Sequence, residues 1–224
     1  MHAFYTQYPI MRPYVGVNYE PGGARSLLLI GESHFFPEKS NLHLCAEDWY
    51  RGDVRALSEG EQGWINTAII IKEAIAEGFR NKAHTIYRNA FVEINRNGPK
   101  YPDYRTVGDI IVFYNYFLRP GVFKTSLKVV EEDEIIAEAV FRSVLDEFRP
   151  RGIVFLSKLA YRSWQRHATQ AIETPLVATP HPGCAHWNRV SKSDGGKRGR
   201  EILGEFVQNL WRGATSSCAS DAGL

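Results

Sequence analysis

The sequence predicts an α/β protein, a three-layer αβα sandwich with a central parallel four-stranded sheet, and two observations lead to this fold class. Short apolar segments at residues 26–31, 110–114, 153–156 and 175–179 have the length and composition of buried strands. Segments with the apolar spacing of helices lie between these strands. Strands that alternate with helices pair in parallel, and helices then cover both faces of the sheet.

The size of the chain indicates a single domain. Its 224 residues, 44% of them hydrophobic, suffice for one full core, and no Pro/Gly/Ser-rich linker divides them. We expect the domain to span residues 1–212, beginning with a Tyr- and Pro-rich extended arm over residues 1–25. Residues 213–224 are small and polar, so we expect a disordered C-terminal tail there.

The positions of apolar residues predict five helices after the arm, over residues 61–78, 83–95, 132–148, 158–167 and 197–211. The polar segments 37–53 and 184–197 are expected to be loops. The run of acids at 131–134 is interpreted as negative charge at a helix N-terminus, without a specific partner.

Composition excludes few functions. The net charge of +2 argues neither for nor against nucleic acid, and no apolar run is long enough to span a membrane. The three cysteines, Cys45, Cys184 and Cys218, form no Cys-x-x-Cys pair, and no secretory h-region begins the chain, so we expect a cytoplasmic protein. The donors His181, Cys184 and His186 match no structural zinc pattern, and we expect neither metal nor cofactor.

Polar residues stand at the ends of three predicted strands. Glu32 follows Gly31 at the end of the first strand, Asn115 ends the second, and His181 follows the last, between Pro180 and Pro182. In parallel sheets ligands bind beyond the carboxyl ends of the strands, so we expect these residues to share one crevice. A carboxylate can act as a general base, an amide can recognise a polar ring, and an imidazole can stabilise an anion. The alternatives are a helix-capping carboxylate, an Asn bonded to its own turn, and a structural His.

The residues that follow Glu32 are also candidates for a binding pocket. Ser33 and His34 supply polar groups, and Phe35 and Phe36 could stack on a flat ring, although such aromatics more often belong to a core. Ser33 lacks the Gly-x-Ser-x-Gly surroundings of a hydrolase nucleophile.

The segment after His181 is basic and contains one aromatic residue. An aromatic side chain beside cations could contact phosphates and fill a gap in a base stack, whereas the alternative is a solvated surface loop. The residues concerned are Trp187, Arg189, Lys192, Lys197 and Arg198.

Taken together, the motifs resemble those of the uracil-DNA glycosylase superfamily, over about residues 26–211 and in the same order. One branch of that superfamily has Gly-Gln-Asp-Pro-Tyr-His after the first strand, and another branch has Gly-Glu-Ala-Pro-Gly there. In the superfamily a later strand ends in an Asn that recognises the base. The last strand ends in His-Pro-Ser. Here Ser33 stands in the place of the Asp of the first branch, Glu32 matches the Glu of the second, and Gly183 replaces the Ser. The corresponding segments are Gly31-Glu-Ser-His-Phe-Phe36, Val112-Phe-Tyr-Asn115 and His181-Pro-Gly183.

The resemblance implies a DNA glycosylase of base-excision repair that hydrolyses the N-glycosidic bond of a flipped, modified or deaminated base. Glu32 would orient the water and His181 would stabilise the departing base, while Gly31, Ser33, His34, Phe35, Phe36 and Asn115 would line the base pocket. The implied partner is DNA, single-stranded or damaged, and the expected state is a monomer. Because Ser33 replaces an Asp, the alternative is a catalytically altered member that binds nucleic acid or a nucleobase without cleaving it. Gly-Glu-Ser-His is also loosely similar to erythromycin-esterase-like proteins, but these are much longer and have no place for His181-Pro.

Overall fold

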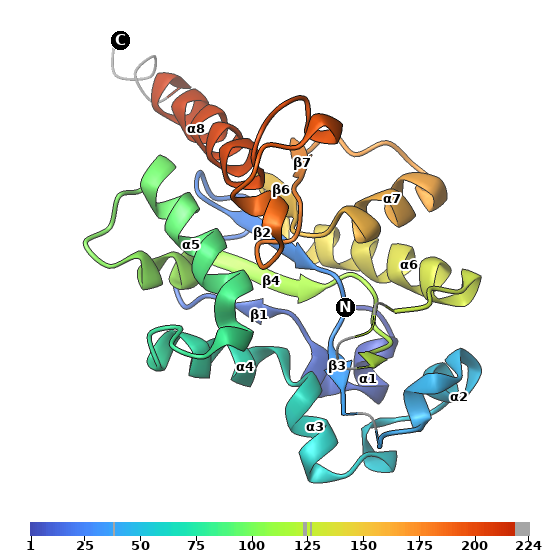
Figure 1. The fold of residues 1–224 in the computed structure, drawn as a ribbon. Helices are drawn as coiled ribbons and strands as arrows, with labels where there is room; N and C mark the ends of the chain where they lie inside the picture. Colours follow the sequence, from blue (N-terminus) through green and yellow to red (C-terminus); the bar gives the residue numbers. More distant parts are fainter. Residues whose placement is uncertain (38, 123–124, 126, 218–224) are drawn as a thin grey trace.

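The computed structural model describes residues 1–37, 39–122, 125 and 127–217, and within them it shows an α/β protein with a mixed, mostly parallel sheet of five strands (Figure 1). The strand order is β1-β4-β2-β6-β7. Four of these strands run parallel to one another, namely β4, β2, β6 and β7. The edge strand β1 is antiparallel to β4. The strands are β1 (Tyr14–Val15), β2 (Leu27–Gly31), β4 (Ile111–Asn115), β6 (Gly152–Phe155) and β7 (Leu176–Ala178).

The fifth strand corrects the expected four-stranded sheet. The four apolar segments are strands as predicted, but Tyr14–Val15 adds to the free edge of β4, with Tyr14 opposite Phe113. An edge strand has unpaired N–H and C=O groups, and a short extended segment of the arm satisfies some of them. A separate pair, β3 (Phe35–Phe36) and β5 (Gly121–Val122), lies beyond the carboxyl end of the sheet.

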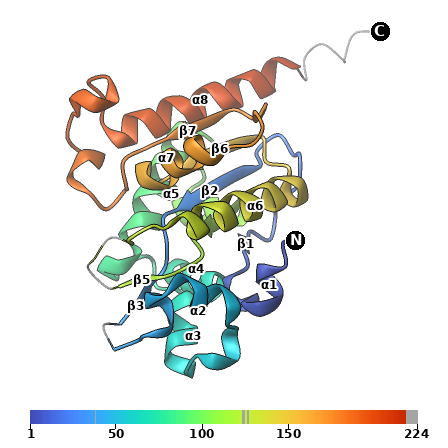
Figure 2. The same ribbon diagram turned by 90° about the vertical axis from the view of Figure 1, so that its right-hand side faces the viewer.

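Helices cover both faces of the sheet, as Figures 1 and 2 show. Helices α6 and α7 pack on the face formed by Leu28, Ile30 and their neighbours, whereas α4, α5 and α8 pack on the opposite face. Alternate residues of β2 point to opposite faces, so a strand between two helical layers is apolar throughout. The helices are α1 (Phe4–Gln7), α2 (Ala46–Arg51), α3 (Glu59–Ile65), α4 (Thr67–Ala76), α5 (Thr85–Asn97), α6 (Glu131–Phe148), α7 (Lys158–His167) and α8 (Gly199–Ser217).

Several helices differ from those expected. The predicted helix 61–78 is two helices, because Asn66 leaves the helical conformation and its side chain accepts a hydrogen bond from the Ile69 N–H, which begins α4. The loop over 37–53 contains α2, and the arm contains α1, whose Tyr5 is completely buried. Helix α8 continues to Ser217 and includes residues 213–217, which we assigned to the tail; residues 218–224 lie outside the described residues.

Two of the four acids at the start of α6 have specific partners, contrary to our interpretation. Asp133 is fully buried and pairs with Arg119, and Glu134 pairs with Arg166 and His167. Among the helices that the structure describes, none is long and apolar enough to cross a membrane.

Candidate functional site

Gly31 and Asn115 lie side by side where β2 and β4 end. They are paired in the parallel register, and the Asn115 side chain is packed so closely over Gly31 that a Cβ added there would lie 2.1 Å from Asn115 Oδ1. Only glycine fits this approach, because any larger residue would displace the amide. Asn115 is 8% exposed, so its amide is held almost entirely within protein.

Glu32 is fixed by Ser157, a residue that we did not select from the sequence. The Ser157 hydroxyl donates a hydrogen bond to Glu32 Oε2 at 2.6 Å and also accepts one from the Ala160 N–H at 3.3 Å as the N-cap of α7. The side chain thus joins the end of β2 to the start of the helix after β6. The sequence did contain a signal for Ser157, because a polar residue also follows the predicted strand at 153–156.

His181 projects from the segment after β7 with a defined tautomer. Its Nδ1 accepts a hydrogen bond from the Gly183 N–H at 3.0 Å, so the proton of the neutral ring resides on Nε2. The imidazole is exposed, but the protein around it lowers its pKa, while the nearby Glu32 carboxylate acts in the opposite direction. The net result is a neutral ring at pH 7 that offers an N–H. Asn89 holds the segment in place by donating to the Pro182 carbonyl at 2.8 Å.

His34 points into the protein and is not open to solvent at the end of β2. It is 6% exposed, and its Nε2 lies 3.0 Å from Thr67 Oγ1. The Thr67 hydroxyl is directed to the carbonyl of Met11 at 3.4 Å, so it accepts the hydrogen bond from the His34 ring. Burial lowers the pKa of His34 to about 4. These contacts make His34 a neutral connection between the end of β2, the start of α4 and the N-terminal arm.

The two phenylalanines of β3 have opposite environments. Phe36 is fully buried and packs edge-to-face against His43 and Trp49, which agrees with the core alternative. Phe35 is 37% exposed and is therefore the aromatic ring that is free to contact a ligand. Ser33 is 7% exposed, and its hydroxyl has no hydrogen-bond partner among the described residues.

The basic segment contributes fewer free cations than its composition indicates. Lys197 forms an ion pair with Glu205, and Arg198 pairs with Glu201 at 2.8 Å. Arg189 and Lys192 are exposed and form no ion pair within the described residues.

Trp187 differs from our expectation of a wedge that fills a base stack. It is 3% exposed and packs against the start of α8, where a Cβ at Gly199 would lie 2.9 Å from its ring. The apolar ring is more stable in this core than in water, so in this conformation it is not available to nucleic acid.

The ion pair between Lys158 and Asp194 ties the basic segment to the candidate site. Lys158 directly follows Ser157, and the Asp194 side chain is only 4% exposed. Burial raises the pKa of Asp194, but hydrogen bonds from Lys158 and Ser191 outweigh it and leave the pKa below its usual value. The carboxylate is therefore charged at pH 7 and holds residues 191–197 beside the N-terminus of α7.

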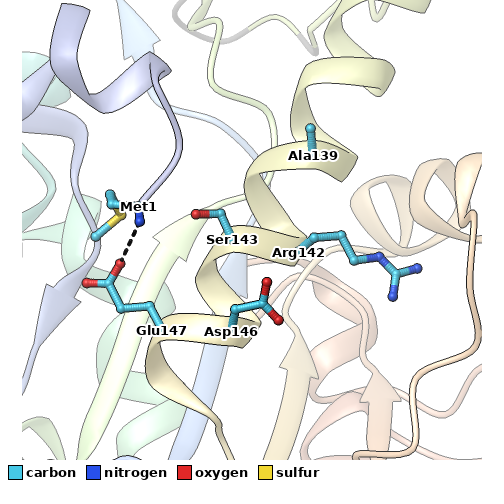
Figure 3. A pocket seen from close by; sticks show the side chains of 6 residues that line it. All are labelled: Met1, Ala139, Arg142, Ser143, Asp146 and Glu147. Atoms are coloured by element: carbon cyan, nitrogen blue, oxygen red, sulfur yellow. Dashed lines mark ion pairs between the residues drawn. The ribbon is translucent and has the colours of Figure 1, made fainter.

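Two surface cavities lie away from these strand ends. One lies along α6 beside Met1, whose amino group is 3.4 Å from Glu147 (Figure 3). The other lies between the ends of α5 and α8. Within the described part of the chain, no three His, Cys, Asp or Glu side chains gather closely enough to hold a metal ion.

The fold and these contacts define an α/β protein that carries the polar side chains of Glu32, Asn115 and His181 at the carboxyl edge of its parallel strands. No family model matches the chain, and no curated protein matches it.

Proposed function

We propose that the chain is a DNA glycosylase-like hydrolase with the three-layer fold of the uracil-DNA glycosylase superfamily, in which β4, β2, β6 and β7 are the shared parallel strands and β1 is an addition. One observation carries the proposal: Asn115 is the last residue of β4, Glu32 and His181 follow the carboxyl ends of β2 and β7, and Glu32 acts electrostatically on His181. An amide, a carboxylate and a neutral imidazole N–H are the groups that recognition and hydrolysis of a base require.

The reaction would begin with a nucleotide flipped out of its stack, which costs a few kcal/mol. The base would stack on Phe35 and be recognised by the amide of Asn115. Glu32 would orient a water molecule towards C1′ of the sugar and accept its proton. As the C–O bond forms, the N-glycosidic bond breaks and its electron pair leaves with the base. The Nε2–H of His181 would donate a hydrogen bond to the negative charge on the departing base.

Ser157 supports this role of Glu32 by fixing one carboxylate oxygen, which leaves the other oxygen available for water. The exposed cations Arg189 and Lys192 would bind phosphates of the DNA strand. Ser33, whose hydroxyl is unpaired among the residues that the structure describes, would line the base pocket beside Gly31. No cofactor is needed for this hydrolysis, and the protein would act as a monomer.

The second candidate is a protein that binds nucleic acid or a nucleobase without cleaving it. It is favoured by Ser33, a neutral hydroxyl at the position where one branch of the superfamily has its water-activating Asp. A hydroxyl with no adjacent base is a much weaker proton acceptor than a carboxylate. In this case the same strand-end residues would bind the base, and Glu32 would contribute only to binding.

The deciding experiment incubates excess protein with oligonucleotides that carry uracil, hypoxanthine, xanthine or an alkylated base, and measures abasic sites. Cleavage that Glu32→Ala and His181→Ala reduce by 10²-fold or more, but that the exposed control Glu59→Ala leaves unchanged, supports the hydrolase. Binding without any cleavage favours the second candidate, and cleavage unaffected by both substitutions contradicts the site.

A further inference from the structure

A cavity of about 620 Å³ lies between α5 and α8, at the end of the sheet opposite the candidate site. Its walls come from the segment before β2, from the end of α5 with the turn after it, and from the last turns of α8; Figure 1 shows the two helices side by side. Four cationic side chains line it, and no acidic side chain of the described residues does. These cations are Arg25, Arg96, Lys100 and Arg212.

The floor of the cavity is closely packed. The ring of Trp211 packs directly on Gly98, where an added Cβ would lie 1.7 Å from a ring carbon. Gln208 donates a hydrogen bond to Asn97 Oδ1 at 2.6 Å, and Asn97 in turn donates to the Glu93 carboxylate at 2.7 Å. These contacts connect α8 to α5 along the floor of the cavity.

Lys100 is held in an unfavourable backbone conformation. Its φ is +54°, in the left-handed region, and its N–H donates to the Asn95 carbonyl at 3.1 Å. This conformation costs a non-glycine residue about 1 kcal/mol or more and is common at ligand sites. Glycine would adopt this backbone conformation at a lower cost than lysine. The lysine side chain, however, places a positive charge in the cavity.

Favourable interactions with the C-terminal ends of helices do not account for all four cations of the cavity. Arg96 lies in the last turn of α5, where a cation interacts favourably with the helix dipole, and it pairs with Glu93 at 3.1 Å. Arg25 belongs to neither helix, and Arg25 and Lys100 are exposed and form no ion pair among the described residues. Like charges that gather in one cavity repel each other, and a bound anion removes that cost.

We propose that this α5–α8 cavity binds a phosphorylated small molecule of nucleotide size, at a site separate from the strand ends that carry Glu32, Asn115 and His181. Guanidinium and ammonium groups are the usual ligands of phosphate, and the volume lies within the range of small-molecule sites. The indole of Trp211 provides an apolar surface for the non-phosphate part of the ligand. The proposal does not depend on glycosylase activity.

The test is calorimetric titration of the full chain with ADP and with pyrophosphate at low salt. We expect ADP to bind with a dissociation constant below about 1 mM. The double variant Arg25→Gln/Lys100→Gln should weaken binding at least tenfold. The matched double variant Lys72→Gln/Arg80→Gln removes two exposed charges outside the cavity and should leave binding unchanged, as should Glu32→Ala. Circular dichroism will show whether each variant is folded, and the single variant Arg25→Gln serves if the double variant is not.

Three outcomes would overturn the proposal. The first is the absence of ADP and pyrophosphate binding by the folded protein. The second is equal weakening in both double variants, which would indicate a diffuse effect of net charge. The third is binding of oligonucleotides, weakened by the cavity variant, without binding of either small anion, which would make the cavity a contact for the nucleic-acid backbone.

Discussion

The Ser157 hydroxyl donates a hydrogen bond to Glu32 Oε2 at 2.6 Å, and so joins the ends of two neighbouring parallel strands, β2 and β6. A carboxylate side chain at the end of a strand can otherwise adopt several rotamers. This bond selects one of them, and the place of Ser157 at the N-terminus of α7 fixes the donor in turn.

The first prediction concerns this bond. Ser157→Ala should lower the single-turnover rate of base release about tenfold, because Glu32 would lose the donor that orients it. Ser157→Thr keeps the hydroxyl and should restore most of the rate. Since the serine also caps a helix, the unfolding free energy of each variant must be measured as well. A rate loss that Thr does not reverse would indicate that the serine acts only through the stability of α7.

A second prediction follows from burial of His34. Its pKa is lowered from 6.5 to about 4, so the unfolded chain binds more protons than the folded protein between these values. Stability is therefore complete above pH 6.5 and declines as the pH falls towards 4, by about 3 kcal/mol from this group. Urea unfolding at pH 7 and pH 4.5 should show a smaller decline for His34→Gln than for the unaltered protein. Equal declines would mean that His34 is protonated without cost.

The third prediction tests the contact between Gly31 and Asn115. Gly31→Ala should destabilise the fold by about 1–3 kcal/mol, because its Cβ would lie 2.1 Å from Asn115 Oδ1. In an Asn115→Ala background the same substitution should cost less, since the amide that it displaces is gone. A double-mutant cycle of unfolding free energies measures this coupling, and strict additivity would contradict the contact.

The buried pair of Arg119 and Asp133 gives a fourth prediction. Arg119 Nη2 lies 2.6 Å from Asp133 Oδ2, and the two side chains are 6% and 0% exposed. Asp133→Ala would leave an unpaired buried guanidinium and should cost about 3–5 kcal/mol in urea unfolding. Glu47→Ala, which removes the partner of Arg51 in an exposed pair, is the control and should have little effect. Similar losses for both variants would show that burial does not determine the strength of this pair.

The fifth prediction separates free from paired cations in the basic segment. Arg189→Gln and Lys192→Gln should each weaken binding to an oligonucleotide and reduce the salt dependence of the affinity by about one phosphate contact. Lys197→Gln and Arg198→Gln should weaken it less, because Glu205 and Glu201 already neutralise these side chains. Fluorescence anisotropy at several salt concentrations makes the comparison. Equal effects at all positions would indicate that the segment acts only through its net charge.

The sequence by itself determined the parallel strands, most of the helices after them and the residues at the strand ends. These features depend on neighbours in the chain: a continuous apolar run forms a buried strand, and Gly31 or Asn115 ends it. Strand Tyr14–Val15 was missed, because a strand of that length has no periodicity and forms only where the edge of β4 is available.

Only the tertiary structure decided which side chains near the strand ends are exposed and which are buried. Phe35 and Phe36 are adjacent and chemically identical, yet one is exposed and the other buried, because successive residues of a strand point to opposite sides and the partner of each side is distant in the chain. The bond from Ser157 to Glu32 connects residues 125 positions apart, and no local pattern specifies it. Long-range packing therefore buried His34 against Thr67 and placed Ser157 beside Glu32.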